Sequence, residues 1–586
     1  MKSILFSYII TLTLTLTSSI VYGAGASSFS NVTPGKSIKD LANHNPLFTH
    51  RYSADPGVMV YNNRVYVYAT NDGDVATKFT DDNTYSHINS LNVMSSEDLV
   101  NWTDHGSILV AGNNGAAKWA GNSWAPCATY KKINGKDKFF LYFANNANGI
   151  GVLTSDSPTG PFKDPIGKAL ITRQTPNCGD VAWLFDPAVL VDTDGTGYLY
   201  FGGGVPDGKD AAPKTIRVVK LGADMVSLAG TPQLIDTPYV FEDSGINKIG
   251  NTYYYSYCTN WSAGEPYGQA RIVYMTSSNP MGPFTYQGVC LNNPGEDFQT
   301  YGNNHHTIIE FKNKYYIFYH TEWLNKQVFG TQKGYRTSFV NEITFSNGKF
   351  EKAKGTYEGV SQLSDVDGSK VNNASSFAWQ YGITIKGQDN VLPVNYVKGA
   401  WTGISNVDLG NAKSITLKAY APNGATIKVC VGSENGTVLG YVDIPKGNSL
   451  QNVTGNLDNA SGTKNLFLVS SGDATIESWQ LTGGNSSSTP SPSNGSSNCW
   501  SQSLGYGCCS DCINVIMTDN DGEWGVENDD WCGIPKTCNS NNVSSSCSGA
   551  QGYPCCKSTC LSYFQDSDGE WGVENDDWCL INKSIC

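Results

Sequence analysis

Five short segments of the sequence each stand a little ahead of a run rich in aromatic residues, and three of them carry a carboxylate: Asp55, Asp186 and Glu242. Hydrolysis of a glycosidic bond needs one carboxyl group to protonate the leaving oxygen and another to activate water or attack directly. A third carboxylate nearby raises the pKa of the acid by like-charge repulsion and orients it. We therefore predict that the three side chains occupy equivalent positions of the repeat and form one acid–base site. The five segments are Ala54-Asp55-Pro56, Trp124-Ala125-Pro126, Phe185-Asp186-Pro187, Phe241-Glu242-Asp243-Ser244 and Asn304-His305-His306.

The aromatic runs indicate the elements that would bring these segments together. A turn followed by an aromatic-rich strand recurs five times, about 55 to 75 residues apart, which suits blades of four strands with their loops. The first strand of each blade lies beside the propeller axis, so the five segments are expected to meet at one mouth of the channel. A long β-sandwich with Tyr-rich strands is the alternative. The five runs are 62–68, 135–142, 195–201, 250–257 and 313–319.

The composition limits the possible classes of protein. The chain has 586 residues and a net charge of −13, with 16% charged and 12% aromatic residues. A nucleic-acid footprint is excluded because it needs clustered Lys and Arg, and disorder over the whole length is excluded by the aromatic content. The length predicts several domains, and the class predicted is all-β.

The N-terminal 23 residues read as a targeting segment. An early lysine, an interrupted apolar run and small residues near Gly23 predict a secretory signal over 1–23 and a secreted, extracellular protein. An uncleaved membrane anchor is the alternative. No later run of 18 apolar residues occurs, so we expect no membrane partner.

The rest of the chain divides by composition. We predict the propeller over 40–365, a β-sandwich over 370–484 and a Ser/Pro/Asn linker over 485–498. Two modules follow, at 499–538 and 546–586. Each has six of the 17 cysteines, and a 12-residue motif recurs unchanged between them. Modules this small need disulfides to be stable. Six cysteines allow fifteen pairings, and the sequence does not choose among them.

The segments of the first region resemble glycoside hydrolase family 43, within it the arabinoxylan arabinofuranohydrolase group. The resemblance implies a five-bladed propeller and inversion of configuration. It implies that Asp55 is the general base, Asp186 the pKa modulator and Glu242 the general acid. The matching segments are Asn45–Pro56, Asn122–Pro126, Trp183–Ala188 with Asp194–Gly203, Phe241–Gly245 and Gly302–His306.

The same resemblance implies further site residues. Arg336, within Gly334-Tyr-Arg336, is expected to contact the substrate, because its fork of donors can bridge sugar hydroxyls and a carboxylate. The resemblance also suggests a structural calcium ion in the channel and no organic cofactor. His306 is the expected metal ligand, with His305 the alternative. A histidine that only forms hydrogen bonds in the core is a further possibility. The substrate-binding residues expected are Trp124, Phe185, His306 and Arg336.

The accessory regions resemble other families. Region 370–484 is similar to family 6 carbohydrate-binding modules, and Tyr396, Trp401 and Trp479 are either sugar-stacking or core residues. The cysteine modules resemble fungal dockerins, which are similar to family 10 carbohydrate-binding modules, and this implies a scaffoldin partner. A small cellulose-binding module is the alternative. The docking residues implied are Tyr506, Asp519 and Trp524 in the first module, and Tyr553, Asp566 and Trp571 in the second.

Together these resemblances imply a secreted hydrolase that removes α-L-arabinofuranosyl branches from arabinoxylan while docked to a cellulosome-like complex. A β-xylosidase or an arabinanase would use the same three carboxylates and is the alternative within the family. A catalytically silent propeller that serves as a glycan-binding scaffold subunit is the alternative from another class.

Overall fold

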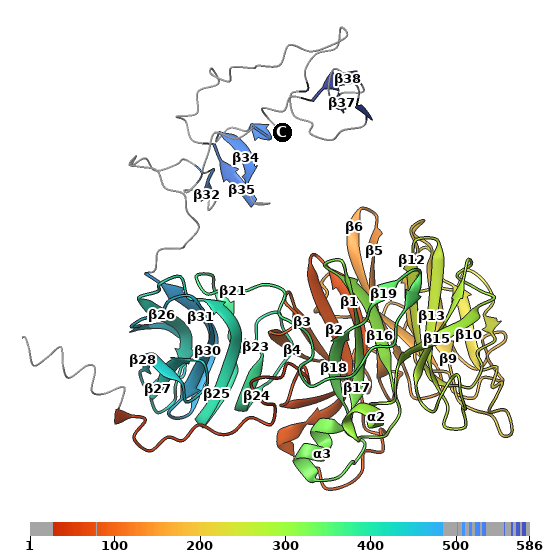
Figure 1. Ribbon diagram of the computed structural model, residues 1–586, viewed down its shortest axis with the longest axis horizontal. Coiled ribbons are helices and arrows are strands. Elements are labelled where there is room, and N and C mark those ends of the chain that lie inside the picture. Colours follow the sequence, from red (N-terminus) through yellow and green to blue (C-terminus); the bar gives the residue numbers. More distant parts are fainter. Residues whose placement is uncertain are drawn as a thin grey trace, which may run out of the picture. The chain divides into compact units, whose positions relative to one another are not determined.

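The computed structural model describes residues 27–77 and 79–483 as nearly continuous chain, and shorter pieces of the cysteine modules (Figure 1). The chain divides into two compact units, Met1–Ser487 and Ser488–Cys586, which we describe separately. The predicted signal segment 1–23 and linker 485–498 lie outside the described residues. The described pieces of the second unit are 501, 507–509, 515–518, 522–527, 530–534, 556, 564–565, 570–574 and 577–581.

Five antiparallel blades follow one another along the first unit, as predicted, and the aromatic runs form the second strand of each blade. The first blade has β1 (Arg51–Tyr61), β2 (Arg64–Asp74), β3 (Ser90–Ser96) and β4 (Trp102–Leu109), with a 3₁₀ turn, η1 (Val75–Thr77), after β2. The second has β5 (Trp124–Ile133), β6 (Lys136–Ala144) and β7 (Ile150–Ser155). The third has β8 (Ala188–Val191), β9 (Gly197–Gly202), β10 (Ile216–Lys220) and β11 (Gln233–Ile235). The fourth has β12 (Val240–Ile249), β13 (Thr252–Thr259), β14 (Ile272–Ser277) and β15 (Thr285–Leu291), and the fifth β16 (His306–Phe311), β17 (Lys314–Thr321) and β18 (Thr337–Glu342).

Buried tyrosines on the second strands join neighbouring blades. Tyr68 on β2 donates its hydroxyl hydrogen to the carbonyl of Pro158, beyond the second blade. Tyr142 on β6 donates to the Met225 carbonyl at 2.5 Å, and Tyr200 on β9 to the Pro280 carbonyl at 2.6 Å. A tyrosine fills the space between blades and satisfies its buried hydroxyl there. Part of the tyrosine content is therefore explained by blade packing.

The ring closes by joining its first strand to its last. Ser53 on β1 pairs in parallel with Thr337 on β18, and the Leu47 amide donates to the Ser338 carbonyl at 3.0 Å. The Asn45 side chain donates to the Val340 carbonyl and accepts from the Val340 amide, each at 2.8 Å. Closure therefore places the start of the propeller beside residues near 336.

The remaining elements of the first unit are short helices, a hairpin and the sandwich. Two α-helices, α2 (Pro294–Phe298) and α3 (Trp323–Phe329), flank the fifth blade, and a hairpin of β19 (Phe345–Ser346) and β20 (Lys349–Phe350) follows it. No described helix is long and apolar enough to cross a membrane. The sandwich strands are β21 (Val366–Asp367), β22 (Asn372–Asn373), β23 (Ser376–Phe377), β24 (Trp379–Ile385), β25 (Val394–Asp408), β26 (Ser414–Tyr420), β27 (Ala425–Val431), β28 (Thr437–Ile444), β29 (Gln451–Asn456), β30 (Thr463–Ser470) and β31 (Ala474–Thr482).

The sandwich and the propeller share one hydrophobic core. β23 extends the first blade by pairing with β4, and it lies where the two regions meet (Figure 1). A single cluster of buried side chains includes Trp102 and Phe318 of the propeller together with Ile404 of the sandwich. Tyr396, Trp401 and Trp479 are core residues, each no more than 2% exposed, so they present no stacking surface for a sugar.

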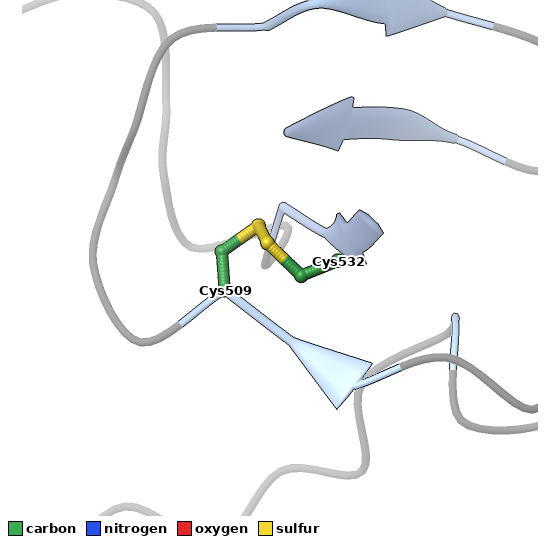
Figure 2. The surroundings of a disulfide bond; sticks show 2 residues. All are labelled: Cys509 and Cys532. Carbon is green, nitrogen blue, oxygen red and sulfur yellow. A yellow bond between two sulfur atoms is a disulfide. The ribbon is translucent and has the colours of Figure 1, made fainter. Parts of the chain in front are cut away.

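The cysteine modules repeat one hairpin and one disulfide. β34 (Glu523–Glu527) pairs with β35 (Asp530–Gly533), and β37 (Glu570–Glu574) pairs in the same register with β38 (Asp577–Leu580). A disulfide joins Cys509 to Cys532 in the first module (Figure 2). The equivalent disulfide of the second module joins Cys556 to Cys579. The other short strands are β32 (Gly507–Cys508), β33 (Met517–Thr518) and β36 (Phe564–Gln565). The five cysteines of the first unit are free thiols.

A buried asparagine gives a test of the shared core. The Asn101 amide donates to Asp98 Oδ2 at 2.7 Å and to the Ser405 carbonyl at 3.1 Å, and its oxygen accepts from the Ser405 amide at 2.8 Å. Asn101→Ala leaves buried polar groups unpaired, so we expect the free energy of unfolding to fall by about 2 kcal/mol. Guanidinium unfolding measures this change. Asn452→Ala, at an exposed site on β29, is the control and should change it by less than about 0.5 kcal/mol.

Candidate active site

The three predicted carboxylates meet in one pocket at the mouth of the propeller channel. The pocket has a volume of about 550 Å³, and Asp55, Asp186, Glu242 and Arg336 line it. All four side chains are buried. The residues come from four different blades, so the pocket exists only when the ring is closed.

A repeated backbone irregularity aims these side chains at the axis. Asp55 (φ 48°), Ala125 (φ 40°), Asp186 (φ 50°) and Asp243 (φ 68°) all adopt the left-handed conformation. In β1, β5 and β12 this residue lies in a break of the strand register typical of a β-bulge. Left-handed backbone costs a non-glycine residue on the order of 1 kcal/mol, and such strain clusters at functional sites.

This backbone register corrects one expectation from the sequence. The left-handed residue of the fourth blade is Asp243, so Asp243 is the backbone equivalent of Asp55 and Asp186. Glu242 is one residue earlier, at the position that Trp124 and Phe185 occupy in their blades. All three of these side chains line the pocket. Glu242 therefore reaches the site from a different backbone position than the two aspartates.

Asp55 is held as an anion. Its Oδ1 lies 2.8 Å from Nη1 of Arg336, and its Oδ2 accepts from the Thr70 hydroxyl at 2.7 Å. The Asp55 amide donates to Nδ1 of His320 at 3.1 Å. Burial alone would raise the pKa of Asp55, but the Arg336 guanidinium outweighs burial and lowers that pKa well below its usual range.

Arg336 is itself fixed by a carboxylate that the sequence did not single out. Its Nε and Nη2 donate to the two oxygens of Asp72 at 2.9 and 3.0 Å, a bidentate pair, and the guanidinium lies over the Tyr85 ring. The fork leaves Nη1 directed at Asp55. Asp72 follows an aromatic strand in a Thr-Asn-Asp-Gly-Asp run that reads as a turn, so no sequence signal marked it.

Glu242 has the opposite electrostatic environment from Asp55. Burial, reinforced by the negative charge of Asp55, raises the pKa of Glu242 to about 8. Its Oε1 is buried and has no hydrogen-bond partner among the described residues. Burial and the charges of Glu242 and Asp55 also hold the pKa of Asp186 well above its usual range. Asp186 Oδ2 accepts from the Asp243 amide at 2.9 Å. At neutral pH the pocket thus contains an ionised Asp55 and a protonated Glu242.

The two adjacent histidines take different positions. His305 lines the pocket, with Nδ1 3.7 Å from Asp186 and 3.8 Å from Asp55. His306 is buried behind it. Its Nδ1 contacts Asp243 in a short hydrogen bond, and its Nε2 lies 2.7 Å from the Ser256 hydroxyl. The structure thus places His305 at the pocket and His306 in a buried hydrogen-bond network.

The expected calcium ion does not fit His306. Both ring nitrogens of this histidine are already engaged, so neither has a free lone pair for a metal. Calcium takes six to eight ligands, mostly oxygen, and among the residues that the structure describes no group of three or more His, Cys, Asp or Glu side chains is arranged to hold a metal ion. We therefore derive no chemical step from a metal.

Aromatic side chains form the pocket walls. Trp124 and Phe185, both predicted to contact the substrate, lie in the wall, and so do Trp183, Phe241 and Trp261. The Trp261 ring is 41% exposed at the rim. Sequence reasoning missed Trp261 because it stands in a loop outside the repeated segments.

The predicted docking residues are only partly described. Trp524 and Trp571 are buried within their modules, at 5% and 4% exposure, which differs from the exposed aromatic anchors that docking would need. Tyr506, Asp519, Tyr553 and Asp566 lie outside the described residues.

Comparison with protein families divides the chain into the same regions. Residues 43–350 match glycosyl hydrolases family 43. Residues 373–483 match a carbohydrate binding module (family 6). Residues 498–534 and 537–581 each match a cellulose or protein binding domain.

Individual relatives extend the similarity across both regions of the first unit. The chain is 45% identical to an arabinoxylan arabinofuranohydrolase of Paenibacillus polymyxa, covering 76% of this chain and 75% of that protein. It is 44% identical to an arabinoxylan arabinofuranohydrolase of Bacillus subtilis, and that match covers 76% of this chain and 93% of that protein. A crystal structure of a family 43 arabinoxylan arabinofuranohydrolase from Bacillus subtilis, in complex with cellotetraose, has a TM-score of 0.74 at 43% identity. That match covers 76% of this chain and 99% of the other. This similarity supports the predicted propeller and sandwich.

The raised pKa of Glu242 has a consequence for stability. A carboxyl group whose pKa is higher in the folded state than in the unfolded state destabilises the fold progressively as pH rises between the two values, here from about 4.5 to about 8. Glu242→Gln removes that ionisation. We expect the melting temperature of this variant to exceed that of the wild type at pH 8.5, by a margin that shrinks toward pH 5.

Asp55→Asn serves as the matched control in the same scans. The pKa of Asp55 is depressed, so ionised Asp55 stabilises the folded state above its unfolded pKa, and the Asn variant should be less stable than the wild type at pH 7. Equal pH dependence of melting in the wild type and in Glu242→Gln would contradict a raised Glu242 pKa.

Proposed function

The chain belongs to glycosyl hydrolase family 43, an inverting family, and we propose that it removes α-L-arabinofuranosyl branches from arabinoxylan. One observation carries the proposal: within a single pocket the pKa of Asp55 is lowered and the pKa of Glu242 is raised. Asp55 is held ionised by Arg336, while burial keeps Glu242 protonated at neutral pH. This is the division between base and acid that inversion requires.

The residues have distinct roles in the proposed reaction. Asp55 takes a proton from water, whose oxygen attacks the anomeric carbon of the arabinofuranosyl unit. Glu242 gives its proton to the departing glycosidic oxygen, so the bond to xylose breaks and the configuration inverts. Asp186 is anchored by the Asp243 amide, and repulsion between its charge and that of Glu242 disfavours ionisation of both groups together. Arg336 keeps Asp55 ionised and offers donors to the sugar hydroxyls.

The shape of the pocket supports an exo-acting enzyme that works on branches. A pocket of about 550 Å³ walled by aromatic side chains suits one terminal sugar, with the backbone lying outside. Trp261 at the rim offers an exposed ring on which a backbone xylose could stack. Both arabinoxylan arabinofuranohydrolase relatives cover three quarters of the chain, which favours this substrate over those of a β-xylosidase or an arabinanase.

The released sugar tests the proposal. Incubation with wheat arabinoxylan should release arabinose alone, first as the inverted β-anomer by proton NMR. Asp55→Asn and Glu242→Gln should each lower kcat by about 10²- to 10⁴-fold. The leaving group of 4-nitrophenyl α-L-arabinofuranoside needs little protonation. On this substrate Glu242→Gln should therefore regain most of the lost kcat, whereas Asp55→Asn should not. Xylose or oligosaccharides as products, or no product, would contradict the proposal.

The pH profile tests the acid and base assignments separately. The basic limb of kcat/KM should fall as Glu242 ionises near pH 8, because the acid must then be protonated. The acidic limb should lie below the usual aspartate range, because Arg336 depresses the pKa of Asp55. Arg336→Gln should move the acidic limb upward. An acidic limb that stays in place in that variant would exclude Asp55 as the titrating base.

We propose further that the two cysteine modules dock the enzyme to a scaffoldin and that the protein is secreted. The match to cellulose or protein binding domains and the disulfides favour an extracellular binding role. Two modules in tandem can gain avidity through effective concentration. Tyr506, Asp519, Tyr553 and Asp566 stay the predicted docking residues, whereas Trp524 and Trp571 are buried and present no exposed anchor. A structural calcium in the channel stays a prediction. His305, which lines the pocket, is its candidate ligand.

A further inference from the structure

A second cavity, larger than the catalytic pocket, lies where the propeller meets the sandwich. We call it the junction groove. It has a volume of about 930 Å³ and lies between residues 71–77, Phe79, 107–116 and 161–162 of the propeller and residues 385–388 of the sandwich. Its size is within the range of ligand-binding sites. Neither the catalytic residues nor the pocket walls described above belong to it.

The groove adjoins the catalytic pocket through shared structure. Asn71 and Gly73 line the groove, and Asp72 between them holds Arg336 in the pocket. The Phe79 ring lines the groove and stacks on Tyr335, the neighbour of Arg336, with ring centroids 4.6 Å apart. Segment 71–73 and the Phe79–Tyr335 stack therefore connect the wall of the groove to Arg336 of the pocket.

The walls of the groove are fixed by hydrogen bonds between the two domains. The Arg51 Nη2 donates to the Ile385 carbonyl at 3.0 Å, and the Ser107 amide donates to the Gly387 carbonyl at 3.3 Å. The side chain of Gln388 also donates to the Thr159 carbonyl. A groove whose walls are fixed in advance loses little entropy when it binds a ligand.

The chemistry of the groove suits a neutral, polyhydroxylated ligand. Its floor carries the Asn71 amide and the Ser90 and Ser107 hydroxyls, which both donate and accept hydrogen bonds. Arg51 is compensated by Asp74 and Asp104, each 3.4 Å away, which leaves Lys386 as the one charged side chain of the described lining without an opposite charge beside it in these pairs. The buried Arg51 Nε has no hydrogen-bond partner among the described residues.

The apolar part of the lining adds surface on which sugar rings could rest. Phe79 and Leu109 line the groove, and Leu109 is 43% exposed. The large aromatic residues of the sandwich are buried in its core, so the sandwich contributes to this groove by its 385–388 segment. A mix of amides, hydroxyls and apolar side chains is the pattern expected for a carbohydrate.

We propose that the junction groove is a second glycan-binding site, which holds an unbranched stretch of the polysaccharide backbone while a branch occupies the catalytic pocket. The identity of the glycan rests on the proposed function. At this site the sandwich contributes to substrate binding through its interface with the propeller. It does so through residues 385–388, none of which is aromatic.

The test uses Leu109→Arg, which places a long charged side chain in the groove. Leu234→Arg on β11 is the matched control, because Leu234 is 44% exposed and lies outside the groove. Xylotetraose binding is measured by calorimetry in full-length protein carrying Glu242→Gln. We expect two sites, reduced to one by Leu109→Arg and unchanged by Leu234→Arg. KM for arabinoxylan should rise about tenfold in otherwise wild-type Leu109→Arg, a change of ~1.4 kcal/mol.

Two further measurements keep the outcome interpretable. Activity on 4-nitrophenyl α-L-arabinofuranoside, which reaches only the pocket, should be the same in Leu109→Arg and the wild type. A loss there would mean that the variant is misfolded, and Asn114→Ala, which removes an exposed groove amide, then replaces it. A single xylotetraose site in the protein without groove substitutions, or equal effects of the two Leu→Arg changes, would overturn the proposal. Failure to release arabinose would refute the proposed function while leaving the second xylotetraose site measurable.

Discussion

The buried ion pair between Arg336 and Asp55 is the interaction on which the chemistry of the site depends. Without a cation, burial would raise the pKa of every carboxyl group in the pocket, and no base would be available at neutral pH. Arg336 outweighs the effect of burial at Asp55 alone. Its Nη1 is directed at Asp55, and its Nε and Nη2 are paired with Asp72. The ionised Asp55 then acts on Glu242 as a like charge and helps to keep it protonated. One fixed guanidinium thus separates the two pKa values.

Ring closure is what places that cation. Arg336 directly precedes β18, and β18 pairs with β1, which carries Asp55. The two side chains are 281 residues apart in the sequence. A buried charge is costly unless it is paired, so the closed ring and the ion pair depend on each other. The strained backbone at Asp55, Asp186 and Asp243 is held by the same closure, since each residue lies beside a neighbouring blade.

The sandwich is joined to the propeller as part of one fold. Its strand β23 continues the first blade, and the two regions share buried side chains. This accounts for core positions of aromatic residues that an independent sugar-binding module would be expected to expose. It also gives the sandwich a direct structural link to the junction groove, through Arg51, which lines the groove and donates to the Ile385 carbonyl.

The sequence by itself determined the blade count, the sandwich, the pair of stapled modules and the three carboxylates, because these are written in local periodicity and repeated segments. It placed Glu242 in register with Asp55 and Asp186, and the structure corrected that, since only backbone dihedral angles show that Asp243 is the equivalent residue. Asp72, Tyr85 and Trp261 carried no local signal. Their roles arise from contacts between residues far apart in the chain, such as the 264 residues between Asp72 and Arg336. Burial and charge pairing, which set the pKa values, are properties of the folded packing, so only the tertiary structure decided that the pKa of Asp55 is lowered and that of Glu242 is raised.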